Sequence, residues 1–184
     1  MKRIALALAL TATLSAAHAV EYTQVQPEKS AINFVYKQMN VAVDGKFKKF
    51  SSQLSFDPAK PAAAKASFDV ELASVDTGAA EGDDEVAGKQ WFNTKAFPIA
   101  HFASSSVKPL GGNRYEVAGQ LTIKGKTQNV TVPATFTQQG NTGVFDGGFS
   151  IHRADFSIGE GSWAKFDIVA NDVQIKFRIT ATGK

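Results

Sequence analysis

The 184-residue sequence contains no cysteine and only three histidines, two methionines and two tryptophans. Without cysteine the chain cannot form a disulfide, a thiolate metal site, an iron–sulfur cluster or a cysteine nucleophile. Charged residues make up only 20% of the sequence and hydrophobic residues 43%, a balance that excludes an intrinsically disordered chain. The length suits one compact domain that buries a sizeable core.

The N-terminus has the three parts of a bacterial secretory signal. Met1–Arg3 is positively charged, residues 4–14 are uncharged and largely apolar, and Ala17-His18-Ala19 supplies small residues before a cleavage site. The apolar run is too short to span about 30 Å of hydrocarbon. We therefore expect residues 1–19 to be a cleaved signal peptide and residues 20–184 to form a single exported domain, periplasmic or secreted and not membrane-spanning.

The positive charge of the chain is mostly targeting charge. The formal net charge is +3, but removing Lys2 and Arg3 lowers the 20 basic residues to 18, against 17 acidic ones. The densest remaining basic group is Lys46, Lys48 and Lys49, which is typical of a solvated hairpin. A nucleic-acid-binding protein needs a clustered basic stripe, so no nucleic-acid partner is expected.

The mature region shows the alternation of apolar and polar residues that predicts antiparallel strands with one buried face. Alternation is clearest over residues 32–36, 54–56, 68–72, 115–123, 130–136 and 173–179. Turn residues separate these segments, namely Asp44-Gly45, Gly111-Gly112-Asn113, Lys124-Gly125-Lys126 and Gly140-Asn141. The pattern breaks over residues 77–95, where we expect a short helical insertion from Asp83 to Trp91.

About eight closely spaced strands predict an all-β fold, most simply a closed antiparallel β-barrel without exposed edges. Such a barrel is wide enough to be filled by side chains or to hold one small ligand. The sequence has 14 phenylalanines, many of them on the predicted inward faces. Large flat side chains favour a cavity for an apolar ligand. A core simply filled by aromatic residues remains the alternative.

No catalytic or metal-binding signature is present. Only His101 and His152 remain after cleavage, and no paired-histidine zinc motif exists. The acidic group Asp83-Asp84-Glu85 does not have the spacing of a calcium-binding loop. GxSxG, GxGxxG and Walker motifs are absent from the sequence. We therefore expect no metal, no cofactor and no catalytic residue, and a binding protein rather than an enzyme.

Four segments of the mature chain carry recognisable motifs. The first comprises residues 30–34, 45–50 and 54–57, and the second is Ser74–Thr77 followed by WFNTKAFPIAHFAS at 91–104. The third is GQLTIKGKT at 119–127, and the fourth comprises RADFSIG at 153–159 and NDVQI at 171–175. In this order they resemble the opening hairpin, the central signature, the G-x-L-T-I-x-G-x-T hairpin and the closing strands of the YceI-like family. The resemblance covers essentially the whole mature chain.

The resemblance implies an exported, lipocalin-like antiparallel barrel that holds an isoprenoid chain, such as a quinone or polyprenyl tail, in an elongated apolar cavity. It also implies that the chain can pair as a homodimer, because family members often do. Relatives commonly carry basic and histidine residues before the aromatic pair, whereas this chain has Glu85, Ala87 and Gly88. A neutral headgroup therefore becomes more attractive than a pyrophosphate.

We expect the cavity wall to come from the inward faces of the strands and from the aromatic residues near one end. The expected wall residues are Phe34, Tyr36, Phe56, Phe68, Val70, Trp91, Phe92, Phe97, Phe102, Leu121, Ile123, Phe136, Phe149, Ile175 and Phe177. The candidates for contact with a headgroup at the mouth are Lys124, His152 and Arg153.

Two other functions fit the sequence. A hydrolase or isomerase acting on an apolar substrate would need a polar group inside the barrel, for which His101 and His152 are the candidates. An interaction protein, for example a partner of a membrane redox protein, would have a filled barrel without a continuous cavity. The presence and lining of a cavity therefore discriminate among the three.

Overall fold

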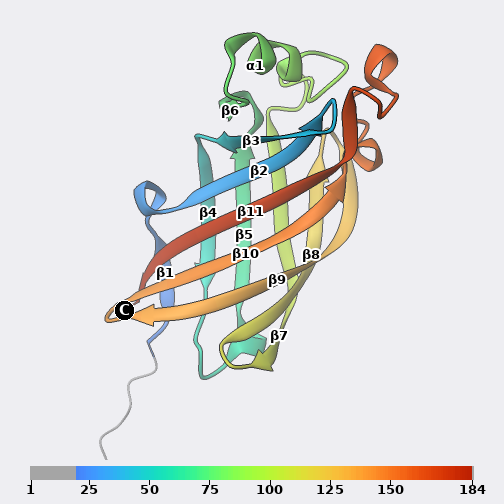
Figure 1. Cartoon of the computed structure of the whole chain (residues 1–184). Helices are drawn as coiled ribbons and strands as arrows, with labels where there is room; N and C mark the ends of the chain where they lie inside the picture. The colour runs from blue at the N-terminus through green and yellow to red at the C-terminus, as the bar shows by residue number, and fades with distance from the viewer. Residues whose placement is uncertain (1–19, 184) are drawn as a thin grey trace, which may run out of the picture.

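The computed structural model describes residues 20–183, so the signal peptide expected at residues 1–19 lies outside the described part. The described strands are β1 Tyr22–Val25, β2 Ala31–Gln38, β3 Val41–Phe47, β4 Phe50–Ser55, β5 Lys65–Glu71, β6 Val75–Asp76, β7 Ile99–Gly111, β8 Arg114–Ile123, β9 Lys126–Gln139, β10 Thr142–His152 and β11 Val169–Gly183. The α-helix is α1 Ala80–Ala87, and the 3-10 helices are η1 Pro27–Lys29, η2 Pro61–Ala63, η3 Leu72–Ser74, η4 Arg153–Phe156 and η5 Gly161–Trp163. Figure 1 shows the long strands crossing the molecule at a tilt.

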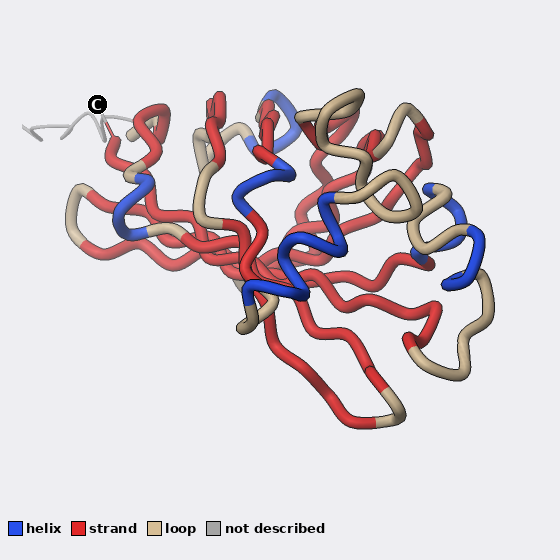
Figure 2. The backbone as a smooth tube through the Cα atoms, turned by 90° about the horizontal axis from the view of Figure 1, so that it is seen from above, coloured by secondary structure: helices blue, strands red, loops and turns tan. Residues whose placement is uncertain are grey.

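All strands belong to one antiparallel sheet with the order β4-β5-β7-β8-β9-β10-β11-β2-β3-β6, and β1 pairs with β11 off this path. Seen from above, the sheet curls around its interior (Figure 2). The all-β, lipocalin-like prediction is confirmed. The expected number of about eight strands corresponds to β2, the consecutive β3 and β4, β5 and β7–β11, with β1 and β6 as short additions.

The two edges of the curled sheet are joined at both ends. At one end β3 runs directly into β4 through a corner at Lys48-Lys49, where the buried Ser74 hydroxyl accepts a hydrogen bond from the Lys49 amide at 3.0 Å. At the other end β1 pairs with β11 on one side and exchanges two backbone hydrogen bonds between Tyr22 and Phe56 on the other. The covalent link between β3 and β4 and the pairing of β1 therefore close the barrel.

Three of the four expected turns connect strands. Gly111–Asn113, Lys124-Gly125 and Gly140-Asn141 contain residues with positive φ, which a tight hairpin requires. The interpretation of Asp44-Gly45 as a turn is wrong, because both residues lie inside β3. A Cβ at Gly45 would overlap the ring of Phe34, so the glycine makes room for an inward-facing aromatic side chain.

The helical insertion is present but shifted from the expected range of Asp83–Trp91. α1 begins at Ala80 because the Asp83 carboxylate accepts hydrogen bonds from the Thr77 amide at 2.7 Å and the Thr77 hydroxyl at 2.8 Å, which fixes the preceding segment. It ends at Ala87, followed by Gly88, and residues 88–97 continue as turns. Among the described residues no helix has the length and apolarity needed to cross a membrane.

Apolar side chains inside the barrel form two groups. One end is closed by an aromatic cluster, called the floor below, of Tyr22, Phe56, Tyr115, Phe136 and Phe145, whose neighbouring ring centroids lie 4.9–5.3 Å apart. The other end is covered by α1 and residues 153–168, called the cap below, which lie at the same end of the molecule in Figure 1. The candidate site lies between the floor and the cap.

Candidate ligand cavity

Two hollows occupy the barrel interior and share part of their lining. The first, near the floor, has a volume of about 180 Å³, and the second, under the cap, has a volume of about 220 Å³. Both are lined by Ile32, Val70, Ala100, Leu121, Phe149 and Ile175. Because these residues line both, the two hollows adjoin along the barrel. We call them the two halves of the cavity, and the shared residues its waist.

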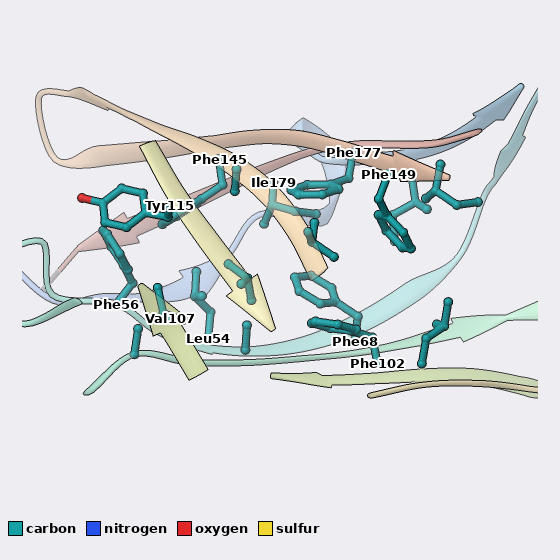
Figure 3. Close-up of a pocket in the computed structure, with 18 of the residues that line it drawn as sticks. Leu54, Phe56, Phe68, Phe102, Val107, Tyr115, Phe145, Phe149, Phe177 and Ile179 are labelled. Atoms are coloured by element: carbon teal, nitrogen blue, oxygen red, sulfur yellow. The ribbon is translucent and has the colours of Figure 1, made fainter. Parts of the chain in front are cut away.

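The half near the floor is almost wholly apolar. Apart from Lys65 and Tyr115, every residue that lines it has an apolar side chain. Figure 3 shows Phe145, Phe149, Phe177 and Ile179 on β10 and β11, facing Leu54, Phe68 and Phe102 on β4, β5 and β7. Rings approach the hollow from opposite walls without filling it, which fits a flexible apolar ligand.

Most of the expected wall residues line this cavity. Those at either half are Phe34, Tyr36, Phe56, Phe68, Val70, Trp91, Phe92, Phe102, Leu121, Ile123, Phe149, Ile175 and Phe177. Phe136 lies instead in the floor, where it packs edge-on against Tyr22 at 5.1 Å. Phe97 lies outside the lining and against Gly125 in the β8–β9 turn. The fold thus brings most of the expected wall residues together around one cavity, and their role in ligand binding stays a prediction.

Sequence reasoning missed the part of the wall that comes from irregular segments. Ile158 and Trp163, between β10 and β11, line the half under the cap, as do Leu72 and Val75 beside the β3–β4 corner. These segments lack a period of two, so alternation cannot identify them. Ile32 alternates clearly with Phe34, and that pattern could have placed it in the wall.

Arg153, expected at the mouth, is the central buried residue of the cap. Its side chain is 1% exposed, and its guanidinium donates hydrogen bonds of 2.8–3.1 Å to six backbone carbonyls. The acceptors are the carbonyls of Ile158, Gly159, Trp163, Lys165, Val169 and Ala170. Burial lowers the pKa of the guanidinium below its usual value. One cation therefore fixes the course of most of the segment between η4 and β11.

Arg153 also contacts aromatic rings of the cap. Its Cζ lies 5.4 Å from the ring centroid of Trp91 and 5.0 Å from that of Phe166, distances that allow cation–π attraction. Gly159 has a φ of 78°, and a Cβ there would overlap the guanidinium. Although Arg153 lines the cavity, its donors are occupied by the chain itself.

Lys124 and His152, the other two headgroup candidates, do not line the cavity. Lys124 is 9% exposed, and its ammonium donates to the carbonyls of Lys89 and Ser157 and pairs with Glu160 at 2.8 Å. It ties the β8–β9 turn to the segment that follows α1 and to residues 157–160 of the cap. His152 is exposed on the outer surface, 3.1 Å from Asp172 and 3.6 Å from Asp155.

The second histidine candidate for catalysis is also outside the barrel. His101 is exposed and contacts the Asp69 carboxylate at 2.6 Å on the outer face of β5 and β7. Neither histidine lines the cavity, so the hydrolase hypothesis loses both residues on which it depended. Residues 20–183 also contain no group of three or more potential metal ligands.

Polar groups of the cavity gather under the cap. Tyr36, Gln38, Thr77 and Glu85 line this half, and the Glu85 carboxylate accepts a hydrogen bond from Trp163 Nε1 at 2.7 Å. Burial, with the nearby Asp83 carboxylate, raises the pKa of Tyr36, so its hydroxyl stays protonated at neutral pH. Trp91 Nε1 is buried and has no hydrogen-bond partner among the described residues. The cavity is therefore polar at one end only.

Comparison with known proteins fits this architecture. The family model described as a YceI-like domain matches residues 23–181. The chain belongs to the YceI-like family. The resemblance noted in the sequence is confirmed, and this member has the family's motifs distributed over the barrel and its cap.

Relatives of this YceI-like chain include a UPF0312 protein of Pseudomonas putida, 37% identical over 76% of each chain. A UPF0312 protein of Pseudomonas syringae pv. tomato is 31% identical over 96% of this chain and all of that one. BcnA of Burkholderia cenocepacia is 50% identical, with a TM-score of 0.85 over 86% of this chain and all of that one. A structure described as a polyisoprenoid binding domain from Saccharophagus degradans shares the fold, with a TM-score of 0.70, 15% identity, and coverage of 90% and 99%.

Replacing Arg153 by Met should destabilise this YceI-like domain by about 3–5 kcal/mol, because six carbonyls lose their donor in a buried setting. Urea unfolding measures the loss, and hydrogen exchange should show the fastest new exchange in residues 153–168. Arg178→Met is the matched control, since Arg178 pairs with Asp146 on the surface and its loss should have little effect. Equal effects of the two substitutions would contradict the assigned role of Arg153.

Acid should loosen α1. Hydrogen bonding from the Thr77 backbone holds the pKa of Asp83 below its usual 3.8, and the Thr77 hydroxyl and Lys48 lower it further against the effect of desolvation. A lowered folded-state pKa means that Asp83 stabilises the fold above pH 3.8 and that this contribution disappears as the pH falls through the lowered value. Hydrogen exchange of α1 amides between pH 6 and pH 2.5 measures this. In the Asp83→Ala variant the α1 amides should already be poorly protected at pH 6, and their protection should depend less on pH. Protection that follows the wild-type pH dependence would refute the role of Asp83.

Proposed function

We propose that this protein binds a polyisoprenoid amphiphile, with its tail along the barrel cavity, and sequesters or carries it after export to the periplasm. The observation that carries the proposal is the pair of adjoining hollows between floor and cap, which are lined mostly by apolar side chains. A filled-barrel interaction protein would lack such a cavity. Binding rather than catalysis also fits the outer positions of His101 and His152.

The cavity suits a long hydrocarbon energetically. Each buried CH₂ group contributes roughly 0.8 kcal/mol, so a tail held by apolar walls binds tightly with few polar contacts. The floor is sealed by packed rings, whereas the polar groups lie under the cap. A tail at the floor and a headgroup at the cap therefore satisfies both halves of the cavity.

The charges favour a neutral headgroup. Arg153 is the lining cation under the cap, and its donors already bind six carbonyls. Glu85, also in this lining, would repel an anion. A pyrophosphate would therefore meet a carboxylate and no free cation within the described lining, whereas a quinone ring would meet donors such as Tyr36 and Trp91.

The relatives support this proposal at the level of ligand class. The structure from Saccharophagus degradans is described as a polyisoprenoid binding domain, and it shares the fold of this chain. If the ligand is a quinone, a membrane redox protein is a natural partner for exchange. Homodimer formation, which the family resemblance implies, is a further expectation of the proposal.

The proposal is tested with a substitution that blocks the cavity between its two halves. Ala100 lies in the lining that the two halves share, and Ala100→Phe should place a ring between them and lower quinone binding at least tenfold. Native mass spectrometry and organic extraction of the purified protein identify co-purified lipid, and tryptophan fluorescence follows titration with a long-tailed quinone.

Ala42→Phe is the matched control, because Ala42 is exposed in β3 and pairs with Lys37 on the outer face. It should bind like the wild type. A wild-type protein that is reproducibly empty, even after incubation with quinones, would refute the proposal.

The buried Trp91 Nε1 predicts a contact with the headgroup. A buried donor without an acceptor is costly, and a headgroup oxygen would satisfy it. Trp91→Phe should weaken quinone binding about five- to tenfold and leave the binding of an oxygen-free isoprenoid hydrocarbon nearly unchanged. Competition titrations with the two probes make the comparison. Equal losses for both would show that Trp91 acts only through packing.

A further inference from the structure

An exposed apolar cluster lies at the edge of the cap. It consists of Met39 in the β2–β3 turn, Val41 at the start of β3, and Phe166 and Ile168 in the last residues of the cap, with exposed fractions of 73%, 65%, 48% and 44%. The Met39 amide donates to the Ile168 carbonyl at 2.7 Å, so the two segments are held together. We call this cluster the tip. In Figure 1 the β2–β3 turn lies at the cap end, away from the β7–β8 turn.

The backbone of the tip presents Met39 outward in an unusual way. Met39 and Asn40 have φ values of 47° and 64°, the conformation of a two-residue turn that favours Asn and Gly. A methionine is uncommon in this left-handed region. A strained position occupied by a large, 73% exposed apolar side chain is typical of a functional surface rather than of an optimised turn.

The tip is continuous with the cavity lining under the cap. Gln38 and Val169 line the cavity, and they immediately precede Met39 and follow Ile168 in the chain. The two residues also pair in the β2–β11 ladder. Phe166 packs at 5.0 Å from the Arg153 guanidinium, which is itself in the lining. A binding partner that covers the tip therefore lies next to the polar end of the cavity.

We propose that the tip docks on a lipid bilayer surface and brings the cap end of the cavity to the membrane. The four side chains expose roughly 300–400 Å² of apolar surface, about half of what each partner of a stable protein complex buries. A small protruding cluster suits insertion at the headgroup boundary. The exposed Lys37 and Lys165 flank it and lack an ion pair among the described residues, and Asp167 accepts the amide of Ile168.

The flanks of the tip also carry acidic groups, because Asp167 lies between Phe166 and Ile168 and Asp172 lies across the β2–β11 ladder near Lys37. The apolar surface, rather than net charge, is therefore what a bilayer would bind. The biological purpose of docking rests on the proposed function, since a lipid carrier must exchange its cargo with a membrane. Docking itself requires no cargo. It can therefore be measured with vesicles alone, separately from ligand binding.

The experiment compares flotation of the protein with vesicles of phosphatidylcholine and phosphatidylglycerol. The variant Met39→Asn/Val41→Thr removes apolar surface while preserving the fold, because Asn suits positive φ and Thr has the shape of Val. It should lower the bound fraction about fivefold or more and should melt no lower than the wild type. Leu110→Thr is the control, since Leu110 is 45% exposed near the β7–β8 turn, at the floor end. It should float like the wild type.

All variants are produced from the complete 184-residue sequence, and intact mass confirms that they have the same N-terminus. Wild-type protein that does not float, or a tip variant that floats equally well, would overturn the proposal. A third result would also overturn it: sedimentation shows that the wild type is a dimer and the tip variant a monomer, while both float equally. The tip would then be an interface between copies of the chain. Ala100→Phe should still float, so failure of ligand binding and failure of docking remain distinguishable.

Discussion

The cap depends on a single buried cation. Segment 153–168 is not part of the sheet, and four of its carbonyls take hydrogen bonds from Arg153, as do the carbonyls of Val169 and Ala170 at the start of β11. The Arg153 guanidinium supplies these hydrogen bonds from one point, and its planar fork reaches carbonyls on both sides of η5. Lys124 performs the same task at the β8–β9 turn, where it joins Lys89 to Ser157. In this protein, therefore, the buried positive charges of Arg153 and Lys124 hold irregular backbone beside an apolar cavity.

Strand alternation was enough to predict the barrel and most of its apolar wall, because a period of two places every second side chain inside. Residues such as Phe34, Leu121 and Ile175 could be placed in this way. The cap could not be predicted, since Ile158 and Trp163 occupy segments whose course is determined by hydrogen bonds to Arg153, far from any local pattern. The resemblance to the YceI-like family marked Arg153 within a motif, but its charge suggested the mouth. Its 1% exposure reveals the opposite environment.

Glycine and asparagine illustrate why turn prediction succeeded at some sites and failed at others. At Lys124-Gly125 the left-handed backbone is a local requirement, so the residue type predicts the turn. At Gly45 the reason for glycine is a ring on the neighbouring strand, which only the three-dimensional register of β2 and β3 discloses. The true β2–β3 turn uses Met39-Asn40 and has no glycine at all. Local rules therefore fail where a side chain on another strand decides the residue.

Closure of the barrel by β1 has a consequence for the order of folding. β1 pairs with the last strand, and the Thr182 hydroxyl bonds the Gln24 carbonyl across a sequence separation of 158 residues. Contacts between chain ends of this kind form late, because the entropy of closing the largest loop must first be offset by the rest of the sheet. The hairpins from β7 to β11 can pair without β1, because each links strands that are neighbours in the sequence. The floor, which needs Tyr22 against Phe136, is completed only when both ends of the domain have arrived.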